Sequence, residues 1–203
     1  MKRALVFGEN VYLRPIERED IDEGWLDWIN DRAVQRHLAS TLPYTRESLE
    51  RYWAASQPPN ATMFAICLHD GDVYIGNARL SEIDWVSRRC KYGRIIGDAK
   101  HRGRGLGSEA LVLLLRYGFH NLGMNRIFSS AIVENEASLA SNDKVGMVRE
   151  GILRQDIWRD GKFLDTVYLA MLREDFDRLH GHPDDWEERD AAVLKKLGIG
   201  CSR

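Results

Sequence analysis

The sequence contains few cysteines, and none of its apolar runs is long. Cysteine occurs at positions 67, 90 and 201, far apart and without any CxxC or Cys/His spacing. The pattern predicts neither a disulfide framework nor a zinc site, and we expect no bound metal. No stretch reaches the roughly 18 consecutive apolar residues of a membrane-spanning helix, and the basic start lacks the apolar core of a signal peptide. We therefore expect a cytoplasmic protein with reduced thiols.

An excess of one charge is also missing. The 203 residues include 29 Lys or Arg and 31 Asp or Glu, which gives a formal net charge of −2. A nearly neutral chain argues against nucleic acid or an anionic membrane as the partner, although a local basic patch is still allowed. The length suits one domain with a real hydrophobic core.

The hydrophobic pattern predicts an α/β chain in the order β-αα-βββ-α-β-α-ββ. Helices are expected where apolar residues recur every three or four positions, at residues 17–29, 45–56, 108–122 and 135–144. Strands are expected at residues 11–16, 62–68, 73–85, 89–97, 126–133, 150–158 and 163–172. This gives a mixed, mostly antiparallel sheet of about seven strands flanked by helices. One parallel pair is expected, across the third helix.

Residues 1–172 are expected to form one domain, and residues 173–203 a helical extension of it. The extension begins with a charged segment that Pro183 interrupts, and a helix is expected over residues 186–197. Its apolar residues, among them Phe176 and Trp186, could cover the core of this chain or that of a second copy. A homodimer is therefore left open.

A glycine-rich stretch before the third helix carries the strongest chemical signal. Gly103, Gly105 and Gly107 stand at alternate positions, together with Arg102 and Arg104. A helix start presents unpaired N–H groups and the positive end of the helix dipole, so this position suits an anion. We predict that the stretch binds a diphosphate.

Other interpretations of the stretch fit less well. A Walker-type loop needs a lysine directly after its last glycine, but Ser108 follows Gly107. A dinucleotide fingerprint can be matched from Gly105 to Ala110, but the acidic residue expected in the next strand is absent and Ser129 stands there. A tight turn without any ligand would leave the ordered motifs on both sides of it unexplained.

Counted from Arg102, the stretch has the form Arg-x-x-Gly-x-Gly between a strand and a helix. This resembles the acyl-CoA-binding signature of the GNAT N-acetyltransferase superfamily. The resemblance is to the ribosomal-protein N-terminal acetyltransferase branch and covers about residues 10–172. The supporting stretches are, in order, Trp28-x-Asn30-Asp31, Ile83-Asp84-Trp85, Ile96-Gly97-Asp98, Gly107-Ser108-Glu109-Ala110, Asn135-Glu136-Ala137-Ser138 and Asp160-Gly161-Lys162-x-x-Asp165.

The resemblance implies an enzyme that moves an acetyl group from acetyl-CoA, its co-substrate, to a primary amine. Backbone N–H groups of the glycine-rich turn would hold the pyrophosphate, and the end of the preceding strand would pair with the pantetheine amides. The residues expected to bind CoA are Ile95, Ile96, Gly97, Arg102, Gly103, Arg104, Gly105, Leu106, Gly107, Ser108, Asn135 and Asn142.

The resemblance also implies an acid and a base. Many superfamily members place a tyrosine acid seven residues after the asparagine that corresponds to Asn135, but this chain has Asn142 there. The ribosomal-protein branch carries a serine where Ser138 stands, so we expect Ser138 to be the acid; the alternative is a helix cap. That branch can carry a glutamate base at the position of Ile157. Here the adjacent Asp156 should point to the opposite face of the strand, unless a bulge redirects it. Other candidates for the base are Glu134, Asp84, Glu82 and water alone.

The acceptor is left open between a protein N-terminus, a small amine and an amino sugar. Trp28, Asn30 and Asp31 have family support as substrate-binding residues, in a region built by the first two helices and the last hairpin. The candidate aromatic walls are Trp25, Trp53, Tyr44 and Trp158. Because the tyrosine is missing and the base is uncertain, a second hypothesis is a catalytically degenerate member that binds CoA as a sensor or scaffold.

Overall fold

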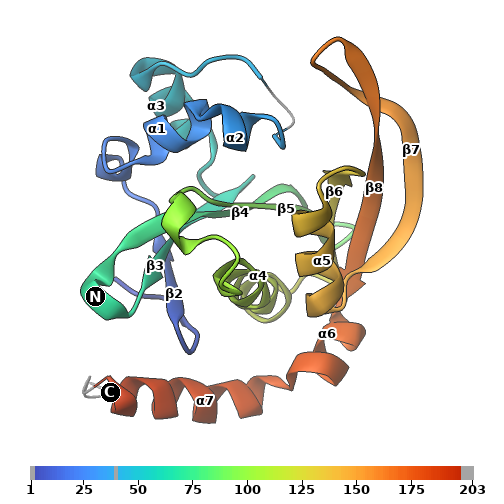
Figure 1. Cartoon of the computed structure of the whole chain (residues 1–203). Helices are drawn as coiled ribbons and strands as arrows, with labels where there is room; N and C mark the ends of the chain where they lie inside the picture. Colours follow the sequence, from blue (N-terminus) through green and yellow to red (C-terminus); the bar gives the residue numbers. More distant parts are fainter. Residues whose placement is uncertain (1–2, 39–40, 198–203) are drawn as a thin grey trace.

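Alternating apolar side chains build a central sheet, and helices cover both of its faces (Figure 1). The computed structural model describes residues 3–38 and 41–197. Within these residues the strands are β1 (Val6–Phe7), β2 (Val11–Pro15), β3 (Thr62–Leu68), β4 (Tyr74–Asp84), β5 (Arg89–Ile96), β6 (Arg126–Ile132), β7 (Val148–Arg159) and β8 (Lys162–Leu172). The α-helices are α1 (Trp25–Asn30), α2 (Arg32–Gln35), α3 (Arg46–Ala55), α4 (Leu106–Arg116), α5 (Glu136–Val145), α6 (Arg173–His180) and α7 (Pro183–Lys196).

The sheet has eight strands in the order β1-β2-β3-β4-β5-β6-β8-β7. The predicted fold class, a mixed and mostly antiparallel sheet flanked by helices, is confirmed. The parallel pair is β5 with β6, as expected on the two sides of α4. The strand that the sequence did not predict is β1, because two residues are too few to display an alternating pattern.

Two helix predictions differ from the structure. The helix expected over residues 17–29 is divided into a 3₁₀ turn (Glu19–Ile21) and α1, because Gly24 between them has φ of 129°. Asp31 then takes an extended conformation and caps the separate helix α2. The helix expected over residues 186–197 begins earlier, at Pro183, since proline suits the first helical position.

Two hydrophobic layers hold the sheet between its helices. One packs α4, with Leu111, Leu114 and neighbouring side chains, against the inward residues of β2 to β8. The other packs Trp25 of α1 and Leu49 of α3 against the opposite face of β2 to β4. The C-terminal helices α6 and α7 join the first layer through Phe176 and Trp186, and Arg116 of α4 donates to Asp190 of α7 at 2.8 Å. The extension therefore covers this chain's own core.

The sheet divides between its two central strands. β5 and β6 are in register over three pairs, from Arg89 with Arg126 to Lys91 with Phe128. Beyond Lys91 the strands have no further register pairs, although β5 continues to pair with β4 up to Ile96. The edge of β5 that faces β6 is thus left open at its carboxyl end.

Candidate active site

A cavity of about 890 Å³ lies where β5 and β6 diverge. Residues from both faces of the sheet line it: the helices α1 to α3 contribute on one face, and the glycine-rich turn, α4 and α5 contribute on the other. In Figure 1 the helices α1–α3 lie above β4 and β5, whereas α4 and α5 lie below and beside these strands. A long ligand could therefore pass from one face to the other between two strands of the same sheet.

The glycine-rich turn has the backbone that its glycines allow. Gly103 and Gly105 have φ of 72° and 80°, which side-chain-bearing residues rarely adopt. Gly105 is the N-cap residue of α4, and its carbonyl oxygen accepts from the N–H groups of Ser108 and Glu109 at 3.0 and 3.1 Å, so the N–H groups before them have no partner within the helix. Both glycines line the cavity, and a Cβ atom on Gly103 would have no neighbour within 4 Å. The turn therefore leaves backbone uncovered beside open space.

Arg94 of β5 lies under this turn. Its Nη1 donates to the carbonyl oxygen of Gly107 and its Nη2 donates to Ser141 Oγ at 2.9 Å. The hydroxyl groups of Ser108 in α4 and Ser141 in α5 are hydrogen-bonded to each other at 2.6 Å, so Arg94 and these two helices share one network. Burial lowers the pKa of Arg94. Within the described residues no carboxylate pairs with it, so a half-buried cation lies at the positive end of α4 without a counter-ion.

The other basic residues of the turn have different surroundings. Lys144 lines the cavity, and its Nζ would lie 3.9 Å from a Cβ atom on Gly105. Arg102 also lines the cavity, but its Nε and Nη2 donate to the carbonyl oxygens of Ile96 and Gly97, at 2.9 and 2.6 Å. Arg104 is exposed and lies outside the lining. Lys144, rather than Arg104, supplies the second cation beside the turn.

The predicted CoA-binding residues are otherwise placed as follows. Ile95, Ile96, Gly107 and Ser108 line the cavity. Leu106 is buried in the core behind the turn, and Gly97 is covered by Trp28, to which a Cβ atom on Gly97 would approach within 2.0 Å. These last two residues shape the site without lining it.

The start of α5 forms the wall opposite Arg94. Asn135 caps the helix by accepting from the backbone N–H of Ser138 at 3.2 Å, and both side chains line the cavity. The cap uses the Ser138 backbone, so its hydroxyl group is not the capping group. Asn142, 1% exposed, accepts a hydrogen bond from the phenol of Tyr92 on β5. Ser138 and Asn142 are therefore brought together on one side of the gap between the strands.

The residues predicted for the acceptor have structural partners. Trp28 packs against Tyr74, with ring centroids 4.8 Å apart and planes inclined at 50°, and covers Gly97 just after the end of β5. The Asn30 amide donates to the Tyr44 carbonyl oxygen and accepts from the Tyr44 N–H, both at 2.8 Å. Asp31 caps α2 and lies 3.9 Å from Arg102. None of the three lines the described cavity, which is lined instead by Trp25, Ile29 and Tyr52 from the same helices.

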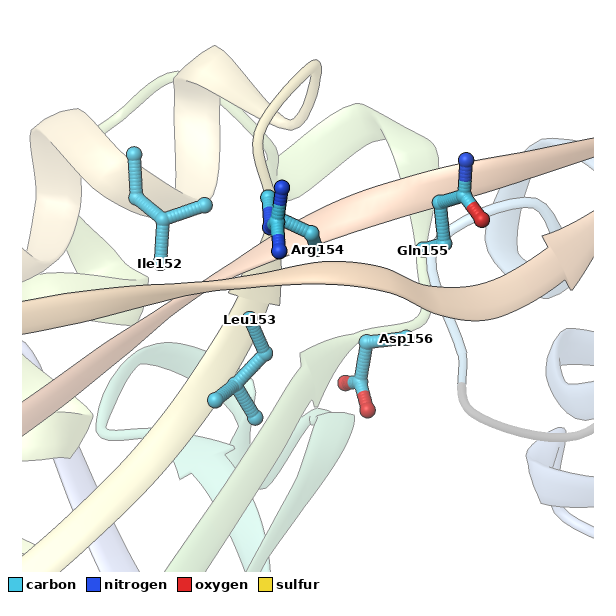
Figure 2. A pocket seen from close by; sticks show the side chains of 5 residues that line it. All are labelled: Ile152, Leu153, Arg154, Gln155 and Asp156. Carbon is cyan, nitrogen blue, oxygen red and sulfur yellow. The ribbon is translucent and has the colours of Figure 1, made fainter.

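Asp156 lies on a bulge of β7. The register shifts between Leu153 and Ile157, and Gln155 there has φ of 52°. Figure 2 shows Leu153 and Asp156 extending to one side of the strand and Gln155 to the other. The Thr166 hydroxyl donates to Asp156 Oδ2 at 2.7 Å, which fixes the carboxylate on that side. The prediction for Asp156 required a bulge to turn it away from the face set by strict alternation, and β7 has a bulge at this position. Asp156 borders a separate hollow of about 570 Å³ and is not brought next to Ser138.

Sequence reasoning missed several residues that line the cavity. Arg79 and Arg94 lie on strands, where an arginine is usually read as solvent-facing, and Lys144 lies in the last turn of α5. His37 follows α2, and burial, reinforced by nearby arginines, lowers the pKa of its imidazole. Arg94 did carry a signal, since it shares a strand face with the apolar Cys90, Tyr92 and Ile96.

A family model of the GNAT acetyltransferase domain matches residues 10–148. The chain belongs to this family. The match spans the strands β2 to β6, the glycine-rich turn and α5, so it contains the residues that line the cavity described above. The predicted superfamily and the enzyme class, an N-acetyltransferase, are confirmed.

Named relatives and solved structures agree with this assignment. The chain is 28% identical over 176 residues to an uncharacterized N-acetyltransferase, p20, of Bacillus licheniformis, covering 84% of this chain and 97% of p20. It is 29% identical over 132 residues to YdaF of Bacillus subtilis, named provisionally as a ribosomal N-acetyltransferase, covering 65% and 71%. It is 26% identical over 177 residues to spermidine N(1)-acetyltransferase of Escherichia coli K12, covering 86% and 92%.

A spermidine N-acetyltransferase of Vibrio cholerae, solved with CoA and spermine, superposes with a TM-score of 0.77 at 23% identity, covering 83% of this chain and 99% of that one. This likeness supports the fold. No helix in residues 3–38 and 41–197 is long and apolar enough to cross a bilayer.

Proposed function

We propose that the protein transfers the acetyl group of acetyl-CoA to the primary amine of a small molecule. The observation that carries this proposal is Arg94 of β5, a half-buried cation that contacts the first turn of α4, has no carboxylate partner among the described residues and lies next to a cavity that crosses the sheet. On the α4 side of the sheet the site has a cation without an anionic partner, and on the side of α1 to α3 the cavity leaves room for a reacting group. A diphosphate joined to a long, thin thioester has this shape and charge.

The binding roles follow from the contacts. The N–H groups of the turn from Gly103 to Ser108, with Arg94 and Lys144, would hold the diphosphate. The open edge of β5 would receive the amides of the pantetheine arm, as an added strand would. The bound co-substrate supplies an activated acetyl thioester, and the residues around the gap orient it toward the helices α1 to α3.

Proton transfer needs an acid and a base. We assign the acid to Ser138, because its hydroxyl lines the cavity and is spared by the helix cap. We assign the base to Asp156, acting through water, because the bulge and Thr166 turn its carboxylate toward one face of the hairpin. Asn135 and Asn142 would line the path of the pantetheine arm.

A small amine is the acceptor that the relatives favour. The Escherichia coli relative is named for acetylation of spermidine, and the match covers most of both chains. The name of YdaF keeps a protein N-terminus as the second candidate.

The proposal is tested with the purified protein, acetyl-CoA and a panel of amines. We expect acetyl-CoA to raise the melting temperature, since a ligand that binds only the native state stabilises it, while NAD at the same concentration does not. We also expect CoA thiol to be released with at least one amine. A shift without release from any amine would favour the degenerate CoA sensor, and no shift with acetyl-CoA would refute the proposal.

A further inference from the structure

Arg79 of β4 is a second cation of the cavity without a carboxylate partner. Its Nη1 donates to the Tyr52 hydroxyl at 2.7 Å, and its guanidinium lies 5.0 Å from the centre of the Tyr52 ring. Its Nε is buried and has no hydrogen-bond partner within the described residues. Tyr52 therefore holds the guanidinium in place but leaves donor capacity unused.

The position of Arg79 is on the acceptor side of the gap. It pairs in register with Gly93 of β5, two residues beyond the last pair of β5 with β6. A Cβ atom on Gly93 would meet nothing within 4 Å, so the space beside Arg79 is open. Tyr52 belongs to α3, which covers the face opposite α4 and the diphosphate site. Arg79 therefore belongs to a different part of the cavity from Arg94.

Other charges near Arg79 do not cancel it. Lys91 lies 3.3 Å from Glu82, and these two line the cavity as a pair of opposite charges. Glu82 is the one carboxylate among the described residues that line the cavity. Because the charges of Lys91 and Glu82 offset each other, the charge of Arg79 on the acceptor side is not neutralised by a carboxylate of the cavity lining.

We infer that Arg79 binds a carboxylate carried by the acceptor itself, so that the substrate class is amines with an anionic group and not polyamines. The inference rests on the proposed function and narrows its acceptor. A carboxylate in the cavity would form a charge-assisted pair with the guanidinium. A polycation such as spermidine would bring more positive charge to a side that already has an unpaired cation.

The test compares matched acceptors that differ in one charge, with CoA thiol release as the measurement. One arm pairs each common amino acid with its amide, the second pairs peptides that have Glu or Gln after the N-terminal residue, and the third is spermidine. We expect the carboxylate member of the best pair to have kcat/KM higher by roughly 10- to 100-fold. Whether the best pair is found in the first or the second arm distinguishes a free amino acid from a peptide terminus.

Variants locate the effect. Arg79→Gln should lower the preference to within about threefold, mainly by raising KM, while Arg79→Lys should keep part of it because the charge remains. Arg51→Gln, an exposed arginine of α3 whose partner is Glu47, should leave the preference unchanged. The ratio of kcat/KM for a carboxylate acceptor to that for its amide is measured on the unsubstituted protein, so this part of the test holds even if Arg79→Gln does not fold.

Two results would overturn the inference: an amide or spermidine as the best acceptor, or an unchanged ratio in folded Arg79→Gln. Either would leave the proposed acetyl transfer intact, because thiol is still released. Absence of any thiol release, with or without a thermal shift by acetyl-CoA, would instead remove the catalytic function on which the inference rests.

Discussion

The guanidinium of Arg94 donates to the carbonyl oxygen of Gly107, within the first turn of α4. The contact depends on the glycine, since a Cβ atom on Gly107 would lie 3.2 Å from Arg94 Nη1. The pair places a half-buried cation at the end of a helix whose dipole is also positive there. This combination is unfavourable in the empty site and favourable once an anion binds.

Arg94→Met should therefore separate ligand binding from stability. Loss of the cation is expected to weaken acetyl-CoA binding by about 10- to 100-fold, measured by calorimetry. The melting temperature of the empty protein should stay the same or rise, because a buried charge without a counter-ion is replaced by an apolar side chain. Arg51→Met is the matched control on an exposed helix. Normal acetyl-CoA affinity in Arg94→Met would contradict this role.

Gly97→Ala should destabilise the fold by roughly 1–3 kcal/mol, because its Cβ atom would lie 2.0 Å from Trp28 Cδ2. The measurement is the free energy of unfolding in urea. Adding Trp28→Leu should recover part of the loss, so the two changes should not be additive. Gly93→Ala is the control, since its Cβ atom would have no neighbour within 4 Å. Equal effects of the two alanines would show that the contact with Trp28 is not the cause.

Ser138→Ala should lower kcat by about 10²- to 10⁴-fold if the hydroxyl is the acid. The KM for acetyl-CoA and the melting temperature should change little, because the helix cap uses the backbone N–H of Ser138. Steady-state kinetics with the best amine of the panel measures this. Full turnover in the variant would assign the acid to another group.

Asp156→Asn should lower kcat with a near-isosteric side chain, and Thr166→Val should lower it less, since valine removes only the hydroxyl that orients the carboxylate. Comparison of the two variants at several pH values tests whether the carboxylate itself takes the proton. If Asp156→Asn keeps both the rate and its pH dependence, the amine loses its proton to water.

His120 should make the fold sensitive to acid. Burial lowers the pKa of its imidazole, although Asp177 lies 3.1 Å away and opposes the shift. A folded-state pKa below the ordinary value of about 6.5 means that the stabilising contribution is present above that pH and is lost as the pH falls below it. The melting temperature should drop between about pH 7 and 5, and less so in His120→Gln. Parallel curves for the two proteins would rule out this histidine.

Much of the fold and the diphosphate site could be predicted from local signals. Periodic apolar residues located most of the helices and strands, and Gly103 and Gly105 marked a left-handed backbone that other residues rarely adopt. Arg79 gave no signal in the sequence, and Arg94 gave only that of its apolar strand face, because their place in the cavity depends on how two strands diverge and on which helices cover the gap. Asp31 was expected at the acceptor, but its position next to α2 lets it cap that helix.

The redirected Asp156 illustrates the same limit. Strict alternation along β7 places it on the wrong face, and nothing in residues 152–157 marks the bulge. The bulge follows from pairing with β8, where Gln155 N–H donates to Asp165 at 2.8 Å, so only the partner strand reveals it.

Within the described residues, the two halves of the sheet are joined by three register pairs between β5 and β6 and by hydrogen bonds from the N–H groups of Asn125 and Arg126 to the carbonyl oxygen of Arg88. The sheet thus has two parts, β1 to β5 and β6 to β8, which meet over a short length of paired strand, and the contact between α4 and α5 links them a second time. We expect backbone fluctuations to be largest where β5 meets β6, because the strands within each part are paired over longer registers. A ligand bound between β5 and β6 would contact both parts of the sheet. Each catalytic cycle would therefore make the protein more rigid when the ligand binds and more flexible when it leaves.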